Sequence, residues 1–383
     1  MTAQDCLADD LTVVQRLLHH IDNQTTDTAK ATWREPVAHY LSETRLGSEL
    51  EFAFRRRPVP LCPSAALPLA GSYLAREAAG TPILAVRGSD GKVRAFRNAC
   101  RHRGMQLASG AGRKKAFVCG YHGWTYGVEG DLRHVPHQEG FPDLDKRSRG
   151  LAPLETSERS GIVFVTQRPP EARASHLDAL PPLIGSQWRL ARTTESEVAA
   201  NWKVLVEGFL EGYHIRATHP QTFYPVQFDN LNLVETFGCN SRVTFPYRAI
   251  NKLREVPPAE LCVDRKLTYV YHLFPNVIVA TFPQRLIVIV LEPLALGRTG
   301  FITYELIDRE QSEPGTQERS AKGLDLINAG GAEDRAVARA IQCSLASGAN
   351  EFFEFGLYEG AISHFHRNLT AMLDESADAL RQS

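Results

Sequence analysis

Residues 98–124 read NACRHRGMQLASGAGRKKAFVCGYHGW and contain two short pairs of potential metal ligands. The first pair is Cys100-x-His102, the second is Cys119-x-x-His122, and sixteen residues separate them. Thiolates prefer an iron–sulfur cluster or zinc, and imidazole ligands on one iron of a two-iron cluster raise its reduction potential. A cluster with two thiolates on one iron and two imidazoles on the other therefore fits this ligand set.

A structural zinc site is the alternative, because two Cys and two His also satisfy zinc. Zinc sites more often show paired Cys followed by paired His than one of each in each loop. We expect each pair to lie at the tip of a hairpin, where loops can converge on a metal. Glycines near the pairs allow the close backbone approach that a buried cluster requires; they are Gly104, Gly110, Gly112, Gly120 and Gly123. The spacing favours an iron–sulfur cluster.

This stretch resembles the signature of Rieske-type non-haem iron oxygenases, C-x-H-x16-C-x2-H, with Arg-Gly after the first pair and Gly-Trp after the second. The resemblance implies that Cys100 and Cys119 bind one iron of a [2Fe–2S] cluster and that His102 and His122 bind the other. Gly120 stands where many members of the family carry Pro, at a position that supplies no ligand.

The composition is that of an ordinary globular chain. Its 383 residues exceed the usual size of one domain, so we expect two. A formal net charge of -1 gives no sign of nucleic acid or a membrane surface as the main partner. The amino terminus is acidic and lacks the apolar core of a signal peptide, and the longest apolar run is interrupted by Glu292. These features predict a cytoplasmic protein.

The hydrophobic pattern changes twice along the chain. Helical spacing covers residues 9–20, and short alternating strands with turns at Asp90-Gly91 and Glu129-Gly130 follow from about residue 58 to residue 165. Residues 167–182, with Pro near both ends, are predicted to form a linker. A helix beginning at Asn201 then precedes several consecutive strand-like runs, which predict a large antiparallel sheet. Helical spacing returns from residue 332.

A second group of metal-binding residue types lies in residues 201–220, NWKVLVEGFLEGYHIRATHP. On a helix, Glu207, Glu211 and His214 would form one stripe. The apolar residues would form a second stripe, consisting of Trp202, Val206, Phe209 and Tyr213. Buried carboxylates are costly unless a metal or a partner compensates them. His214 and His219 are five residues apart and would diverge on a regular helix, so we expect local unwinding.

Two His and one remote carboxylate form the facial triad of non-haem Fe(II) oxygenases. A di-iron carboxylate site would need Glu-x-x-His on two helices, and the sequence holds only Glu211-x-x-His214. A pair of ordinary histidines is the remaining alternative, which the Cys-His pairs disfavour. The third ligand should be a carboxylate far downstream, and in residues 330–345, GGAEDRAVARAIQCSL, a helix is predicted to start at Glu333 and Asp334 after two glycines.

The resemblance to the Rieske oxygenases extends to this second group, because N-W-K followed by an acidic residue, Tyr-His and a second His is the pattern of their catalytic domain. It implies that His214 and His219 bind a mononuclear iron. Glu211 would be the acidic bridge to a Rieske His of a neighbouring subunit. Gly208 stands where many relatives have Asn.

The family pattern also places an Asp eight residues before a Gln on a downstream helix. Asp334 and Gln342 fit this pattern, so the resemblance implies that Asp334 is the third iron ligand. Glu333 is the fallback for that role.

The fold class implied is α+β. A β-sandwich Rieske [2Fe–2S] domain over residues 46–168 would accompany a helix-grip catalytic domain, an antiparallel sheet with helices, over residues 183–383. The amino-terminal helical part, residues 1–45, would belong to the catalytic domain.

The activity implied is that of an oxidoreductase, the large (α) subunit of a mono- or dioxygenase. Electrons from NAD(P)H would pass through a reductase or a ferredoxin to the cluster and then to the mononuclear Fe(II), where O2 reacts. Because this transfer runs between subunits in the family, a head-to-tail homotrimer is implied. We expect hydroxylation of a small organic substrate, an aromatic one in the first place, as in aromatic hydrocarbon catabolism. The alternatives are an O- or N-demethylase or quaternary-ammonium monooxygenase of the same family, and a non-catalytic electron carrier.

Three further groups of residues stand out. A basic neighbourhood surrounds the first pairs and either receives an acidic electron donor or is a solvated loop; it consists of Arg101, Arg103, Arg113, Lys114 and Lys115. Aromatic residues that either line a pocket or belong to the core are Phe223, Tyr224 and Phe228. His364 and His366 lie among helical Phe and Leu residues and are interpreted as structural.

Overall fold

The computed structural model describes residues 7–168, 177, 180–308 and 316–382. The predicted linker, residues 167–182, lies largely outside the described residues. The chain divides into two compact units. The β unit comprises residues 54–174 and 182–186, and the α+β unit comprises residues 1–53, 175–181 and 187–383.

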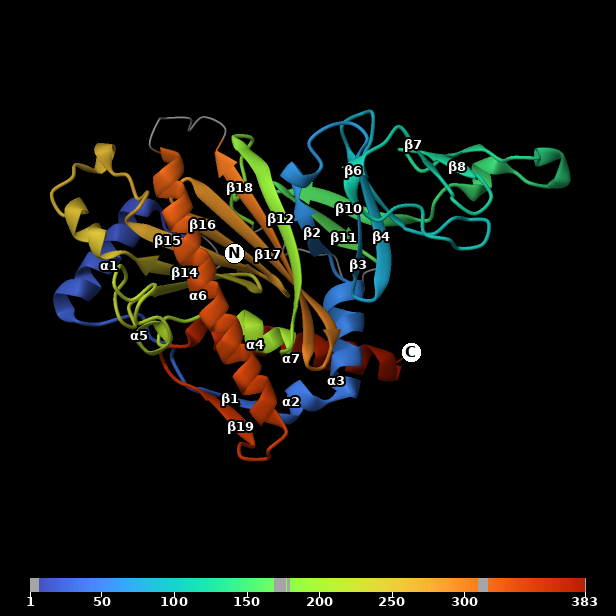
Figure 1. Cartoon of the computed structure of the whole chain (residues 1–383). Coiled ribbons are helices and arrows are strands. Elements are labelled where there is room, and N and C mark those ends of the chain that lie inside the picture. Colours follow the sequence, from blue (N-terminus) through green and yellow to red (C-terminus); the bar gives the residue numbers. More distant parts are fainter. Residues whose placement is uncertain (1–6, 169–176, 178–179, 309–315, 383) are drawn as a thin grey trace. The chain divides into compact units, whose positions relative to one another are not determined.

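The β unit contains a seven-stranded sheet in the order β2-β11-β10-β5-β4-β3-β6 and a three-stranded sheet in the order β7-β8-β9 (Figure 1). The strands of the larger sheet are β2 Val59–Pro63, β3 Ser72–Ala78, β4 Thr81–Arg87, β5 Val93–Arg97, β6 Gly110–Arg113, β10 Pro153–Arg159 and β11 Ile162–Thr166. Those of the smaller sheet are β7 Ala116–Val118, β8 Thr125–Gly127 and β9 Leu132–His134. All neighbouring strands pair antiparallel, which confirms the predicted β-rich region.

Both predicted hairpin turns are confirmed. Strands β4 and β5 pair around Asp90-Gly91, and strands β8 and β9 pair around Glu129-Gly130. Cys100 and Cys119 belong to one buried hydrophobic cluster of this unit, although they lie in different loops. The core therefore fixes the positions of both thiols.

The α+β unit is built on a seven-stranded antiparallel sheet in the order β12-β18-β17-β16-β15-β14-β13, as predicted. Its strands are β12 Trp188–Val198, β13 Leu233–Phe237, β14 Asn240–Pro246, β15 Leu267–Leu273, β16 Val277–Phe282, β17 Arg285–Ala295 and β18 Arg298–Asp308. A separate two-stranded sheet joins β1, Trp33–Pro36, to β19, Phe352–Phe355, so it brings the amino-terminal segment to the carboxy-terminal one.

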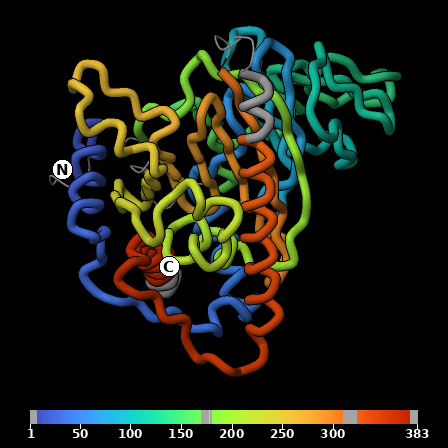
Figure 2. Tube along the Cα trace, turned by 60° about the vertical axis from the view of Figure 1, so that its left-hand side comes forward, coloured from blue at the N-terminus to red at the C-terminus, as the bar shows by residue number. Residues whose placement is uncertain are grey.

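Helices pack around this sheet. They are α1 Asp10–Asn23, α2 Ala38–Leu41, α3 Glu43–Ser48, α4 Trp202–Glu207, α5 Ile215–Thr218, α6 Thr316–Leu345 and α7 Gly360–Gln382. Helix α4 contacts β17 and α6, α5 contacts α6, and α7 packs on β13 and β14. Figures 1 and 2 show α6, in orange, as a long rod beside the strands. The short helix α4 thus contacts both the sheet and α6.

The predicted start of a helix at Glu333 and Asp334 is wrong. Helix α6 begins at Thr316 and continues through Gly330 and Gly331, so both carboxylates lie in its interior. A Cβ atom on Gly330 would overlap the ring of Phe223. The glycine there permits close packing against that ring and does not end or begin a helix.

None of the helices in the described part of the chain combines the length and the apolar composition that a membrane-spanning helix needs.

We predict that Gly330→Ala destabilises the α+β unit, because the added methyl group must displace the Phe223 ring. Overpacking of this kind costs about 1–3 kcal/mol. Gly323→Ala is the matched control on the same helix, since an added methyl group there would meet nothing within 4 Å; it should stabilise by about 0.5–1 kcal/mol through helix propensity. Urea unfolding followed by circular dichroism measures both. Equal effects of the two substitutions would contradict the packing role of Gly330.

Candidate functional site

The two Cys loops of the β unit have the same backbone design. The N–H of Cys100 donates to the carbonyl of Met105, and the N–H of Gly104 donates to the carbonyl of Cys100, both at 2.8 Å. The corresponding bonds of the second loop run from Cys119 to Trp124 at 2.8 Å and from Gly123 to Cys119 at 2.9 Å. Each loop is closed by a glycine with positive φ, 82° at Gly104 and 73° at Gly123, which other residues adopt only with strain.

This repeated loop brings all four predicted cluster ligands together. The rings of His102 and His122 lie 4.6 Å apart between centroids, while Cys100 and Cys119 are buried and form no disulfide. Burial lowers the pKa of His102, as do the charges of His122 and Arg103. A neutral imidazole beside a buried thiol pair suits metal ligation. The donor set therefore fits a [2Fe–2S] cluster.

One expectation about these loops is wrong. Cys119 and His122 lie at the tip of the β7–β8 hairpin, as predicted. Cys100 and His102 follow β5, but the next strand, β6, pairs with β3. Their loop is thus a crossover between strands that are not neighbours. The hydrophobic alternation predicts that strands exist but not which of them pair.

In the α+β unit, the predicted helix from Asn201 is shorter than expected. The side chain of Asn201 caps α4 by accepting from the Lys203 N–H at 3.0 Å, and α4 ends at Glu207. Residues 208–214 are not helical, and α5 lies between His214 and His219. The unwinding expected from the spacing of His214 and His219 does not lie between them, because residues 215–218 are helical; the chain leaves the helix before His214 instead.

The physical reason for this early unwinding is the side chain of Glu211. Its Oε2 accepts from the backbone N–H groups of Tyr213 and His214, the latter at 3.1 Å, and so replaces helical hydrogen bonds. The predicted apolar stripe also fails at Tyr213, whose side chain is 62% exposed. A carboxylate that caps a turn cannot at the same time continue a regular helix.

His214, His219 and Asp334 converge on one point. One possible ligand atom of each lies within 4.8 Å of the others. The Oδ1 atom of Asp334 is 2.9 Å from Nε2 of His219 and 3.6 Å from Nε2 of His214. The Nε2 atom of His219 is buried and has no well-oriented hydrogen bond, although a carboxylate is so close. An imidazole nitrogen in that situation fits a metal ligand.

Each imidazole uses its other nitrogen to contact a second carboxylate. Nδ1 of His214 contacts Glu211, and Nδ1 of His219 lies 2.7 Å from Glu333. Glu333 also accepts from the Thr222 hydroxyl at 2.6 Å. Outer carboxylates of this kind fix the tautomer and the orientation of metal-binding histidines. Glu333 therefore contacts the Nδ1 atom of His219, whereas Asp334 lies at the Nε2 atom of the same ring.

The carboxylates give this site an excess of negative charge. Burial alone lowers the pKa of His214, but the hydrogen bond to Glu211 and its charge outweigh burial and raise that pKa. Burial also lowers the pKa of His219, but the close contact and the charge of Asp334, together with the hydrogen bond of Glu333, outweigh burial. The pKa of His219 is therefore raised. Burial raises the pKa of Glu333, whereas the hydrogen bonds with Thr222 and His219 lower it. The net effect is a lowered pKa. Such a site attracts a cation, and a divalent metal satisfies it better than protons.

Two supporting contacts were not anticipated from the sequence. Gln342, noted only for its spacing from Asp334, accepts from the Asn201 N–H at 2.8 Å and so ties α6 to the start of α4. Thr222 holds Glu333 and has no distinctive sequence signal. A hydroxyl three residues after a histidine is too common to single out.

A cavity adjoins the three converging residues. It measures about 170 Å³, comparable with the ~150 Å³ cavity that admits a benzene-sized molecule. Five phenylalanines line it, namely Phe209, Phe223, Phe245, Phe282 and Phe301. The charged residues in its wall are Arg192, Glu211, Glu305, Asp334 and Arg335. Of the three aromatic candidates from the sequence, Phe223 lines the cavity, whereas Tyr224 and Phe228 stack with Arg248 outside it.

Comparisons with known proteins agree with both sites. Residues 57–147 match the family described as Rieske [2Fe-2S] domain, and residues 186–375 match the family described as Ring hydroxylating alpha subunit (catalytic domain). The chain belongs to the α subunits of the Rieske-type non-haem iron oxygenases. The two matched domains imply a Rieske cluster and a non-haem iron.

The relatives found include the carnitine monooxygenase oxygenase subunit of Escherichia coli (strain K12), 33% identical over 51% of this chain and 55% of that protein. The glycine betaine monooxygenase oxygenase subunit of Pseudomonas aeruginosa (strain UCBPP-PA14) is 34% identical over 40% of this chain and 37% of that protein. The alignments thus span about half or less of each relative. A solved quaternary ammonium Rieske monooxygenase in complex with L-carnitine has a TM-score of 0.75 and 22% identity, covering 90% of this chain and 96% of that one, which shows the same fold.

We predict that Glu333→Gln weakens Fe(II) binding to the α+β unit, because the His219 ring loses the carboxylate that orients it. Loss of such an outer partner typically costs about 10–100-fold in metal affinity. Asp325→Asn, on the same helix and exposed, is the matched control and should leave the affinity unchanged. Competition with a chelator measures both dissociation constants. An unchanged constant in Glu333→Gln would show that His219 is held by its packing alone.

Proposed function

We propose that this chain is the terminal oxygenase component of a monooxygenase that acts on a quaternary ammonium compound. Cys100, Cys119, His102 and His122 would hold the [2Fe–2S] cluster, and His214, His219 and Asp334 would hold a mononuclear Fe(II). When bound, these groups supply electron transfer and O2 chemistry. The chain's own residues orient the metal ligands, exclude water and place the substrate.

The observation that carries the substrate class is the aromatic lining of the cavity beside the converging triad. Quaternary ammonium groups bind over aromatic faces, through attraction to the ring quadrupole. The cavity presents five phenylalanines to such a group. Two arginines in the same wall, Arg192 and Arg335, suit a carboxylate at the other end of a betaine-like molecule. The sequence relatives that act on carnitine and glycine betaine support the same class.

The reaction proposed is hydroxylation of a carbon attached to the quaternary nitrogen. One C–H bond, O2, NAD(P)H and one proton give a C–OH bond, water and NAD(P)+. The hydroxylated carbon then loses its C–N bond and releases a tertiary amine, a proton and a carbonyl compound. The electrons come from NAD(P)H through a separate reductase, which this scheme requires as a partner.

The electron path would run between subunits. The carboxylate of Glu211 contacts His214 and is largely buried, with 11% of its side chain exposed. We propose that it bridges to a cluster histidine of a neighbouring subunit in a head-to-tail trimer. The basic residues around the cluster loops, which include Arg103, Arg113 and Lys114, would attract an acidic electron donor.

Aromatic hydroxylation, expected from the sequence, remains the second candidate. The apolar cavity accepts a ring as well as a trimethylammonium group. The named activities of the relatives favour the quaternary ammonium alternative.

We predict that His214→Ala abolishes product formation from carnitine or glycine betaine while the visible spectrum of the reduced and oxidised cluster is unchanged. The substitution removes one metal ligand in the α+β unit, and the four cluster residues belong to the β unit. His19→Ala, on the exposed face of α1, is the control. Amine release, measured by mass spectrometry with a reductase and NAD(P)H, is the assay. Turnover near the wild-type rate in His214→Ala would contradict the assignment.

A second prediction tests the substrate class. Phe209→Leu should weaken binding of glycine betaine by about 2–30-fold, which corresponds to the 0.5–2 kcal/mol of a cation–π contact. Binding of a neutral isostere, with a tert-butyl group in place of trimethylammonium, should change much less. Phe228→Leu, which lies outside the cavity, serves as the control. Calorimetry of the iron-loaded protein measures all constants. Equal losses for the cationic and the neutral ligand would favour an uncharged substrate.

A further inference from the structure

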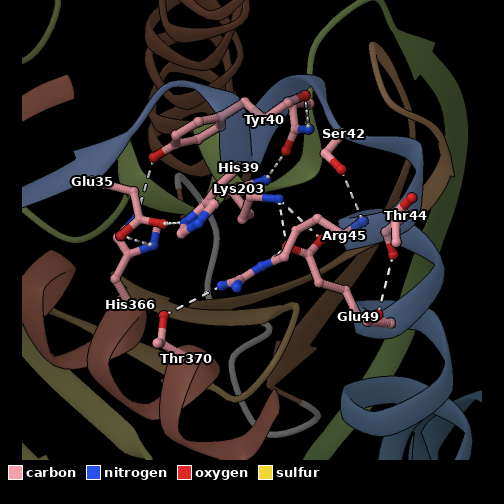
Figure 3. Close-up of polar contacts among 12 residues, drawn as sticks. Glu35, His39, Tyr40, Ser42, Thr44, Arg45, Glu49, Lys203, His366 and Thr370 are labelled. Carbon is pink, nitrogen blue, oxygen red and sulfur yellow. Dashed lines mark hydrogen bonds and ion pairs between the residues drawn. The ribbon is translucent and has the colours of Figure 1, made fainter. Parts of the chain in front are cut away.

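A network of buried ionisable residues lies in the α+β unit, apart from the metal-binding triad (Figure 3). It joins the amino-terminal segment, α4 and α7. Glu35, Glu49, Lys203 and His366 each have an exposure of 1% or less. Burying so many charges is costly and is not needed for a stable core. The arrangement of the groups therefore calls for a functional reason.

His366, on α7, lies between two carboxylates. Its Nε2 atom is 2.9 Å from Oε1 of Glu207, and its Nδ1 atom is 3.5 Å from Oε2 of Glu35. Nδ1 is buried and has no well-oriented hydrogen bond. An imidazole with an acid on either side can accept a proton at one nitrogen and release a proton from the other. The ring of His366 is thus placed between two acids that the sequence did not connect with it.

One end of the network reaches solvent. Oε1 of Glu35 is 2.6 Å from Nδ1 of His39, whose side chain is 29% exposed. Burial raises the pKa of Glu35 and the hydrogen bond to His39 lowers it. The net effect is a decrease, so this carboxylate stays ionised and carries a proton only while it passes it on. His39 can therefore exchange protons with water and with Glu35.

The other end of the network is the carboxylate of Glu207. Glu207 is the last residue of α4, and its carboxylate also accepts from the Tyr40 hydroxyl at 2.6 Å. Glu359 interacts electrostatically with Glu207 as well as with Glu211 and His214, so it belongs to both groups. Burial, and then the negative charges of Glu211 and Glu207, raise the pKa of Glu359.

The remaining charged groups around the network are fixed. Lys203 Nζ is 2.7 Å from Glu49, Arg45 Nε is 3.4 Å from Glu49, and Arg45 also donates to Thr370. Lys203 stands 5.3 Å from the centre of the Tyr40 ring. Burial, together with the charge of Glu207, raises the pKa of Tyr40 far above its usual value, so Tyr40 remains a hydrogen-bond donor. These groups surround Glu207 and hold it beside the His366 ring.

We propose that His39, Glu35, His366 and Glu207 form a proton relay between solvent and the carboxylates beside the metal-binding triad. A proton passes from Nδ1 of His39 to Glu35. It then passes to Nδ1 of His366 once a small movement of the ring closes the 3.5 Å gap to Oε2 of Glu35. Nε2 of His366 gives a proton to Glu207, which leaves the ring in its other tautomer. The relay rests on the proposed function, in which each turnover consumes protons to make water. It supplies those protons by a route separate from the substrate cavity, which Glu35, His39, Glu207 and His366 do not line.

The first test needs no turnover. Infrared spectroscopy of the resting holoenzyme after rapid mixing with D2O follows deuteration of the buried carboxyl band, identified by its loss in Glu207→Gln or Glu359→Gln. His366→Gln should slow that exchange by about tenfold or more, because an amide cannot pass the proton on. His364→Gln, whose imidazole on the same helix faces backbone carbonyls and not acids, should exchange like the wild type. Unchanged exchange in His366→Gln, or the absence of any such band, overturns the proposal.

The second test uses the surface end of the relay and covers the case in which His366→Gln does not fold. His39→Ala should lower amine release several-fold, and imidazole in the buffer should restore it. His20→Ala removes a similar histidine–carboxylate pair, 3.1 Å from Asp27, and should change nothing. A loss in His39→Ala that imidazole does not restore contradicts the relay. If exchange is slowed in His366→Gln but the wild type does not oxidise betaines, the proposed substrate class is wrong. The relay is then still supported.

Discussion

The α+β unit is organised around two imidazoles that each lie between two carboxylates. Asp334 faces the Nε2 atoms of His214 and His219, and Glu211 and Glu333 contact their Nδ1 atoms. Three acids around two histidines form a site that is electrostatically incomplete without a cation. The surrounding structure follows from the need to hold these groups. Helix α4 must end early so that Glu211 can cap a turn, and α6 must pass close to Phe223, which Gly330 allows.

The β unit meets a different constraint. Each of two loops must hold a thiol that is buried in the core and an imidazole that lies nearer the surface. Both loops meet this constraint with the same geometry, because Gly104 donates a backbone hydrogen bond to Cys100 and Gly123 donates one to Cys119. Burial of the thiols excludes water from one side, while His122 remains exposed. An exposed ligand is suited to electron exchange with a partner, which the proposed function requires.

The sequence predicts which residues come together better than it predicts the elements that carry them. Cys100, His102, Cys119 and His122 are recognisable because their spacing is local, and the structure brings them together. The start of α6 is mispredicted because Gly330 and Gly331 have the composition of a helix boundary, whereas tertiary packing against Phe223 overrides local propensity. The surroundings of His366 escape the sequence for a related reason. Its partner Glu207 is 159 residues away, and only folding reveals that the ring lies between acids.

The central claim is that this chain holds a two-iron cluster in one unit and a single iron in the other. Iron and acid-labile sulfide analysis of anaerobically purified protein, combined with electron paramagnetic resonance of the reduced form, tests it most directly. The account predicts about three irons and about two sulfides per chain, with a Rieske-type signal. If zinc is found in place of the two cluster irons, the Cys-His loops form a structural zinc site. Two irons alone would contradict the mononuclear site and leave an electron carrier.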